Sequence, residues 1–172
     1  MIIQILLYQY PIEEYKSLRE NKKEVQGTSL EMNTSCFECH FTDLPQLFKL
    51  HLKGVDMDYE DGLFTINMNQ SGSGRSEKHI KISEIYNITI FSDTSSLELF
   101  FNDGAYALTT RIYEDSDSVE ITSDVEMNMT AYQLKGINLE PAKYAGSFLF
   151  STYIKKVLIF STQVLTLLKE WL

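Results

Sequence analysis

Apolar and polar residues alternate along much of the chain before residue 137, as expected for strands that bury one face. The pattern is clearest between Asn87 and Glu114, where alternate positions are apolar: Leu97, Leu99 and Phe101. This run ends at Asn102-Asp103-Gly104, a hairpin signal, because a tight turn between strands needs a positive φ, which glycine adopts freely. The stretch therefore predicts three consecutive strands.

Similar patterns predict further strands over residues 2–10, 35–42 and 47–52 and a hairpin over 55–68. Ile12 to Asn21, which follows Pro11, predicts a short helix or turn. Two short strands are expected over 119–129, and a closing strand over 132–135. Turn signals roughly every 8 to 12 residues between short strands are typical of a β-sandwich.

The last part of the chain has a different pattern, which predicts a helical tail over residues 138–172. Its apolar residues recur at helical spacing: Phe150, Ile154, Val157, Leu158, Leu165 and Leu168. Lys155 and Lys156 lie in the middle, whereas a membrane span needs about 20 apolar residues with few charges. We expect a helix that packs on a surface or a partner. A poorly ordered tail and a membrane-associated one remain alternatives.

Composition narrows the classes of partner. The chain has 172 residues, enough for one domain with its own core, and its net charge of -9 argues against nucleic acid and anionic membrane surfaces as partners.

Cys36 and Cys39, if on one strand, lie about 10 Å apart, which is beyond disulfide reach. Reduced thiols and a first segment without a basic region or cleavage site predict a cytoplasmic protein. An extracellular location stays open if the parent gene is longer.

Candidate metal and cofactor motifs are weak. Residues 36–40 match the C-x-x-C-H pattern of c-type haem attachment, but they lie in a run with strand alternation. A zinc site would need more ligands, and the other histidines are His51 and His79. The acidic turn from Asp56 to Gly62 lacks the spacing of an EF-hand. We expect a plain strand with Cys39 facing inward, and neither a metal nor a cofactor.

Two segments resemble one enzyme family. Residues 90–104, IFSDTSSLELFFNDG, and 107–113, ALTTRIY, resemble a signature of the C-terminal β-sandwich of glycoside hydrolase family 32, which includes invertases, levanases and sucrose-6-phosphate hydrolases. Residues 9–19, QYPIEEYKSLR, resemble the link between catalytic propeller and sandwich in that family. The resemblance covers about residues 4–137. Thr94 stands where the family usually has arginine, and a second typical arginine is absent between Met68 and Gly72.

This resemblance implies an all-β fold of two antiparallel sheets packed face to face, jelly-roll or concanavalin-like, over residues 1–137, with 1–21 as the linker. In the family, catalysis resides in an N-terminal five-bladed propeller, whose motifs are absent from this sequence. A retaining glycosidase needs two carboxyl groups about 5 Å apart, and no motif here places such a pair. We therefore expect no catalytic residues and no enzymatic activity of the chain on its own.

Three functions remain as hypotheses. The first is a non-catalytic module that braces a catalytic propeller, with the propeller on a separate chain, or that self-associates. The second is a stand-alone module that binds fructan or sucrose through tyrosine rings, with these candidates: Tyr8, Tyr10, Tyr59, Tyr86, Tyr106 and Tyr113. The third is a truncated fragment with no independent function.

Overall fold

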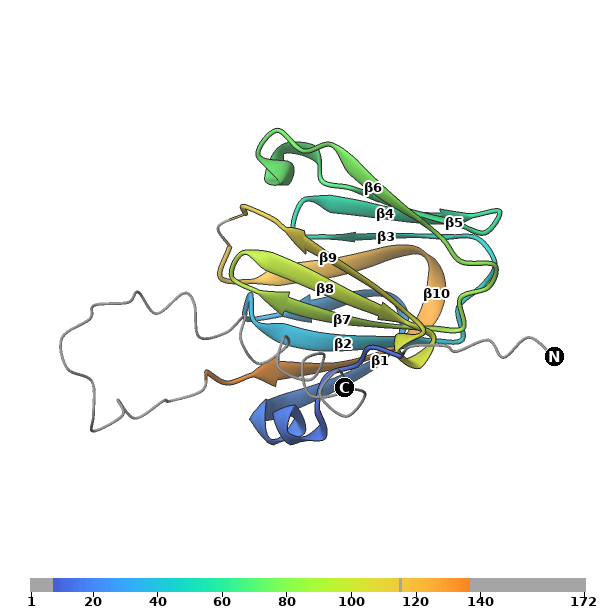
Figure 1. Cartoon of the computed structure of the whole chain (residues 1–172). Helices are drawn as coiled ribbons and strands as arrows, with labels where there is room; N and C mark the ends of the chain where they lie inside the picture. Colours follow the sequence, from blue (N-terminus) through green and yellow to red (C-terminus); the bar gives the residue numbers. More distant parts are fainter. Residues whose placement is uncertain (1–7, 115, 137–172) are drawn as a thin grey trace, which may run out of the picture. The chain divides into compact units, whose positions relative to one another are not determined.

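A computed structural model describes residues 8–114 and 116–136, and strands dominate this part of the chain (Figure 1). The strands are β1 (Arg19–Met32), β2 (Phe37–Thr42), β3 (Phe48–Leu52), β4 (Val55–Glu60), β5 (Leu63–Asn67), β6 (Glu77–Lys81), β7 (Asn87–Asp93), β8 (Ser96–Phe101), β9 (Tyr106–Arg111) and β10 (Val119–Leu134). Short 3₁₀ segments are η1 (Glu13–Leu18), η2 (Asn69–Gly72) and η3 (Asn102–Gly104). The predicted all-β fold is confirmed.

Antiparallel pairing connects the strands in the order β6-β5-β4-β3-β10-β2-β7-β8-β9, with β1 on β10. Strand β10 belongs to both halves of this path, because Thr122 and Ser123 pair with β3 whereas residues 128–133 pair with β2. We call β3, β4, β5, β6 and the first half of β10 the β3 sheet. The β7 sheet comprises β2, β7, β8, β9 and the second half of β10.

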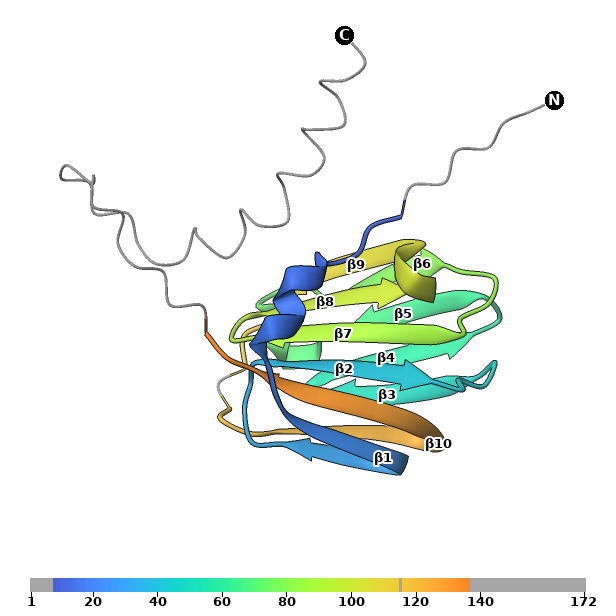
Figure 2. The same ribbon diagram turned by 90° about the horizontal axis from the view of Figure 1, so that it is seen from below.

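Strands β1 and β10 form a two-stranded ribbon that doubles back on itself (Figure 2). The ladder is irregular between Gly27 and Ser29 of β1. Lys23 Nζ donates a hydrogen bond of 2.5 Å to the carbonyl of Glu31, although a straight strand would separate these residues by about 26 Å. Where β10 turns away from β3, the carboxylate of Asp124 accepts a 2.7 Å hydrogen bond from a backbone N–H of β3. The ribbon therefore joins the two sheets at one side.

The core lies between the inner faces of the two sheets. Alternate residues of each strand face inward, as in β2, where Phe37, Cys39 and Phe41 have no exposed surface. Phe64 of β5 and Phe101 of β8 meet edge to face with ring centroids 4.7 Å apart, which joins the two halves of the strand path. Burying each phenylalanine contributes about 1.5–3 kcal/mol.

The free edges of β6 and β9 are linked by side chains. Lys78 Nζ in β6 donates a 2.6 Å hydrogen bond to the carbonyl of Thr109 in β9. Arg75, just before β6, likewise donates to the carbonyl of Arg111 at 2.6 Å. Unpaired backbone groups at a sheet edge invite pairing with another chain, and long cationic side chains occupy two of these acceptors here.

A buried lysine joins the turn between β3 and β4 to the end of β7. Lys53 is 4% exposed, and its Nζ donates to the carbonyl of Asp93 at 2.7 Å. Burial lowers the pKa of Lys53. The next residue, Gly54, has a φ of 67°, and a Cβ there would lie 2.4 Å from a carboxylate oxygen of Glu114. The left-handed φ and these close side chains favour glycine at this turn.

The boundaries differ from the sequence predictions in three places. The short helix or turn predicted over Ile12 to Asn21 is present as the 3₁₀ segment η1, but it ends at Leu18, and Arg19 already begins β1. Residues 8–10 form no strand. Residues 119–134 form one bent strand instead of the two short strands and separate closing strand, because the polar bend in the middle reads as a turn. The predicted helical tail over 138–172 lies outside the described residues. No helix in the described ranges has the length and hydropathy to span a membrane.

Candidate functional site

The segment before β1 crosses the outer face of the β7 sheet, and we call residues 8–18 the N-terminal strap (Figure 2). Backbone hydrogen bonds hold both ends: Gln9 N–H donates to the carbonyl of Gly104 at 2.9 Å, and Lys135 N–H donates to that of Leu18 at 3.0 Å. Two tyrosines of the strap pack on phenylalanines of the sheet, with centroid distances of 5.5 Å for Tyr10–Phe100 and 5.0 Å for Tyr15–Phe91.

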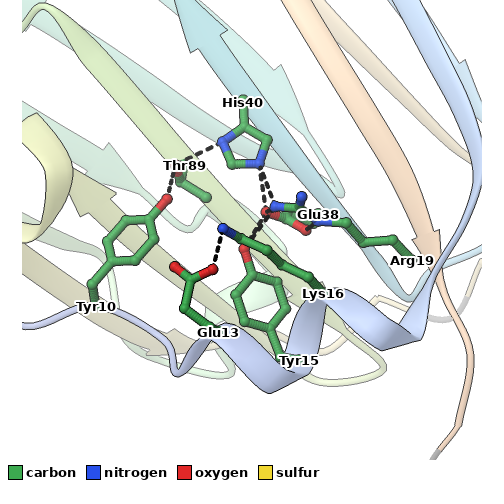
Figure 3. A network of polar contacts seen from close by, with 8 residues as sticks. All are labelled: Tyr10, Glu13, Tyr15, Lys16, Arg19, Glu38, His40 and Thr89. Carbon is green, nitrogen blue, oxygen red and sulfur yellow. Dashed lines mark hydrogen bonds and ion pairs between the residues drawn. The ribbon is translucent and has the colours of Figure 1, made fainter.

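A buried carboxylate lies beneath the strap. Glu38 of β2 has no exposed surface, because its neighbours in the strand face the core and it faces η1. Arg19 donates to both of its oxygens, from Nε to Oε2 and from Nη2 to Oε1, each at 2.6 Å (Figure 3). The hydroxyl of Tyr15 donates to Oε1 at 2.6 Å, and His40 Nε2 lies 2.5 Å from the same oxygen.

Arg19 lies between two aromatic rings. Its guanidinium carbon is 4.5 Å from the ring centroid of Tyr132 in β10 and 5.2 Å from that of Tyr15. Hydrogen bonds to Glu38 raise the pKa of Arg19 above its ordinary value. A bidentate contact with a carboxylate combined with stacking on rings suits arginine and not lysine, whose ammonium cannot form this planar fork.

The charge state of Glu38 is fixed. Burial alone would raise its pKa, but hydrogen bonds from His40, Arg19 and Tyr15 outweigh burial and lower the pKa to about 2. Burial and the contact with Glu38 raise the pKa of Tyr15. Glu38 is thus a carboxylate at neutral pH with its oxygens occupied by donors, an arrangement suited to holding the strap and unsuited to proton transfer.

The network continues along the strap through Thr89 of β7. His40 Nδ1 and the hydroxyl of Tyr10 each lie 3.0 Å from Thr89 Oγ1. With a proton on Nε2, His40 donates to Glu38, while Thr89 donates to Nδ1 and Tyr10 donates to Thr89. Among the described residues, no buried side-chain nitrogen or oxygen lacks a hydrogen-bond partner.

Three of the six tyrosines predicted to contact sugar have other neighbours. Tyr10 belongs to the network just described. Tyr59 is 3% exposed and donates to the carbonyl of Ile82 at 3.0 Å, so its ring is not available for stacking on a sugar. Tyr113 is 56% exposed, with the guanidinium carbons of Arg75 and Arg111 each 5.9 Å from its ring centroid.

The other three tyrosines gather around η3, and we call them the tyrosine patch: Tyr8, Tyr86 and Tyr106. Their exposed fractions are 58%, 53% and 38%. Sugar contact by these rings stays a prediction. The clustering follows from the hairpin turn that the sequence identified, because Gly104 accepts the hydrogen bond from the strap and Asn102 accepts one from the N–H of Tyr86.

The turn η3 has a left-handed backbone at three consecutive residues. The φ values of Asn102, Asp103 and Gly104 are 52°, 56° and 90°. The Asn102 amide donates to the carbonyl of Glu84 at 2.7 Å, and Asn87 exchanges two hydrogen bonds with Asp103. A Cβ on Gly104 would lie 2.4 Å from the carbonyl oxygen of Gln9, so the contact with the strap also requires glycine.

The residues of the C-x-x-C-H motif lie in separate environments. Cys39 is in the core, where burial raises the pKa of its thiol. Cys36 Sγ donates to Asp93 Oδ1 at 3.2 Å, and His40 is part of the network under the strap. This arrangement does not suit haem. Within the ranges that the structure describes, no group of three His, Cys, Asp or Glu residues could hold a metal ion.

Carboxylates also line a groove of about 450 Å³ on the β3 sheet, beside His51 and Lys49. Each of these carboxylates has a partner: Asp56 with His51 at 2.6 Å, Asp58 with Lys49 at 3.3 Å, and Asp124 with the backbone of β3. Hydrogen bonds from Asn69 and His51 lower the pKa of Asp56. Each of the three carboxylates of this groove is therefore held in a structural contact.

A protein-family model matches most of this chain. The model of "Glycosyl hydrolases family 32 C terminal" matches residues 14–138. Sucrose-6-phosphate hydrolase of Bacillus subtilis is 25% identical over 145 residues, which cover 74% of this chain and 30% of that protein. The enzyme of the same name from Lactococcus lactis is 26% identical over 141 residues, 75% of this chain and 28% of the other. The chain thus spans about a third of the length of these relatives.

Solved structures share the fold. The sucrose-6-phosphate hydrolase from Lactobacillus gasseri superposes with a TM-score of 0.66 at 22% identity, over 74% of this chain and 31% of that one. A family 32 beta-fructofuranosidase from Bombyx mori superposes with a TM-score of 0.62 at 22% identity, over 74% of this chain and 30% of that one. In both, the match covers about a third of a longer chain.

Proposed function

The chain belongs to the family of glycosyl hydrolase family 32 C-terminal domains, and on this basis we propose that it is a non-catalytic module that docks on, and stabilises, a catalytic domain that hydrolyses sucrose or related fructosides. One observation carries the proposal: the match covers most of this chain but only about a third of each relative. The catalytic domain resides either on a separate chain or on a longer parent protein.

The side chains of the described residues support a non-catalytic role. Glu38, the most deeply buried carboxylate, is held by three donors with its pKa lowered to about 2, which makes it unfit as a general acid. Glu98 has a pKa raised by burial and by Asp93, but a raised pKa at one carboxyl supplies half of the pair that retaining glycosidases use.

The N-terminal strap supports the docking role. Residues 9–19, which include most of the strap, resemble the link between catalytic propeller and sandwich in family 32, so a preceding domain would join the sandwich through this segment. Here Arg19 and Glu38 tie the strap to β2, and Gln9 ties it to η3. A preceding or docked domain would therefore meet a firmly attached segment, so its orientation relative to the sandwich would be restricted.

Two assays test the proposal. Purified chain is incubated with sucrose and with sucrose 6-phosphate, and we expect no hydrolysis above the buffer control; turnover by the chain alone would overturn the non-catalytic role. In the second assay, the chain replaces the matched C-terminal region of the Bacillus subtilis enzyme. We expect the chimera to keep activity at temperatures that inactivate the same enzyme without a C-terminal region. Equal inactivation of the two proteins would overturn the stabilising role.

A second candidate is a stand-alone module that binds fructan or sucrose. The observation in its favour is the exposure of four tyrosine rings: Tyr8, Tyr86, Tyr106 and Tyr113. Isothermal titration with inulin, levan and sucrose, combined with light scattering, decides this question. Heat of binding by a monomer would favour the sugar-binding module. Self-association without heat would favour a module, or a fragment, whose docking surface lacks its partner.

A further inference from the structure

We infer that the tyrosine patch is the surface through which the sandwich contacts its catalytic domain. This inference rests on the proposed function and adds the residues that make the contact. The occupant is the domain that precedes the C-terminal domain in family 32 enzymes, because the polypeptide enters the sandwich at this point. At the beginning of the strap, Gln9 N–H donates to the carbonyl of Gly104 in η3, so the chain that leads into the strap reaches the sandwich at this turn.

The patch is assembled from three distant segments by the turn η3. Gln9 N–H bonds to Gly104 and places Tyr8 on one side of the turn. Tyr86 N–H bonds to Asn102 Oδ1 at 3.0 Å, which places Tyr86 on another side. Tyr106 begins β9 and pairs with Phe101, the last residue of β8 before η3. The strap, the residue before β7 and the first residue of β9 thus present one ring each around a single turn.

The turn that presents these rings is rigid. Its three left-handed residues are held by hydrogen bonds from the amides of Asn87 and Asn102 and by the backbone of the strap. Left-handed non-glycine residues are uncommon and persist where the surroundings determine them. A preorganised surface loses little conformational freedom on binding, so more of the contact energy appears as affinity.

The exposure of the patch distinguishes it from the rest of the surface. Among the described residues, large apolar side chains with high exposure are Tyr8, Leu47, Leu63, Tyr86, Tyr106 and Tyr113, and half of them gather at η3. Clustered exposed apolar rings mark interaction surfaces, and tyrosine is enriched at the centres of interfaces between proteins.

The charge within the patch specifies the chemistry of the partner. Asp103 lies at the tip of η3, and its carboxylate is oriented by Asn87 Nδ2 at 2.9 Å. Partial burial, the Asp103 charge and then Tyr8 raise the pKa of Tyr86, which agrees with the three side chains lying close together. The complementary surface is an apolar recess with at least one arginine or lysine that reaches Asp103.

Footprinting of the chimera with Bacillus subtilis sucrose-6-phosphate hydrolase tests the inference. Hydroxyl radicals label exposed tyrosines, and mass spectrometry compares labelling in the free chain and in the chimera. We expect Tyr8, Tyr86 and Tyr106 to lose labelling several-fold in the chimera. Tyr113 is the matched control, since its exposed fraction of 56% resembles the 53% of Tyr86 and it lies away from η3. Its labelling should not change.

Two matched variants give a second readout. Tyr86→Asp should shorten the half-life of the chimera's activity at elevated temperature about tenfold, as expected for loss of a central interface residue. Tyr113→Asp should leave that half-life unchanged. The melting temperature of the free chain should stay the same in both variants, because both rings are exposed.

The outcomes separate the inference from the proposed function. If the chimera is stabilised but its patch is labelled as in the free chain, the inference is overturned and the proposed function stands. If the chimera is no more stable than the enzyme without a C-terminal region, and none of its tyrosines loses labelling, the proposed function fails and the inference fails with it. If levan or inulin protects the patch in the free chain while the chimera leaves it exposed, the patch binds saccharide and the docking inference is overturned.

Discussion

The guanidinium of Arg19, at the first position of β1, forms a two-point contact with the carboxylate of Glu38 in β2, with both hydrogen bonds at 2.6 Å. Glu38 has no exposed surface, and the Arg19 side chain is 19% exposed. The pair lies where the strap ends and the sheet begins. It therefore couples the position of the strap to the integrity of the sandwich.

Removing the cation of this pair should destabilise the fold strongly. Arg19→Ala leaves a buried carboxylate without its main partner, and we expect a loss of about 3–5 kcal/mol in the free energy of unfolding, measured by urea denaturation. Lys16→Ala is the control, because Lys16 contacts an exposed glutamate in η1 and should change stability by less than about 0.5 kcal/mol. Similar losses in both variants would contradict the structural role of the pair.

The same carboxylate should make stability depend on acid pH. The pKa of Glu38 is lowered from 4.5 to about 2 in the folded protein, so its contribution is fully present above pH 4.5 and is lost as pH falls towards 2. This shift corresponds to about 3 kcal/mol. The test compares the free energy of unfolding of the wild type and Glu38→Gln between pH 7 and pH 2. The difference between them should shrink below pH 4.5, and a difference that stays constant would refute the assignment.

The edge contact between β6 and β9 should protect against self-association. Lys78→Ala removes the side chain that occupies the carbonyl of Thr109, which leaves an acceptor free on the edge of β9. We expect dimers or larger species in light scattering at high protein concentration, with a change in stability below about 1 kcal/mol. Lys81→Ala, at an exposed position of the same strand, should remain monomeric. Equal association of the two variants would point to lost charge as the cause.

Gly104 should be needed for the strap to attach. Gly104→Ala places a methyl group 2.4 Å from the carbonyl of Gln9, whereas Gly74→Ala meets nothing within 4 Å. The two glycines have similar φ values of 90° and 86°, so the backbone strain of about 1 kcal/mol is common to both variants. Limited proteolysis should cut the strap faster in Gly104→Ala than in Gly74→Ala. Equal cleavage would show that the close approach is not needed.

The sequence predicted the sandwich because inward residues alternate strictly in its central strands, as at Phe37, Cys39 and Phe41. The sequence pattern does not predict the full length of β1, because this strand lies at an edge and its first half exposes charged residues on both faces. The buried residues of β1 are Leu30 and Met32. Edge strands carry a weak hydrophobic pattern because packing covers little of them.

The buried network could not be predicted from the sequence. Glu38 occupies an outward position of β2, which in a sheet with one solvated face would be exposed. Its burial depends on the strap, which crosses the face from a distant part of the chain. Residues 9–19 contain the tyrosines and the arginine of this network, and their resemblance to a linker predicts a connection between two domains. The resemblance does not predict that this segment covers the outer face of the sheet.

The doubled ribbon also governs when this domain can form during synthesis. Strand β1 is the first strand of the described chain, and it pairs with β10, the last one. Every other described strand leaves the ribosome before this partner does. The edge of β2 that β10 occupies stays open for the same interval. Contacts between such distant segments form slowly, and unpaired strand edges are prone to aggregation meanwhile. The charged residues of β1 therefore discourage pairing with other chains during the interval before β10 is synthesised.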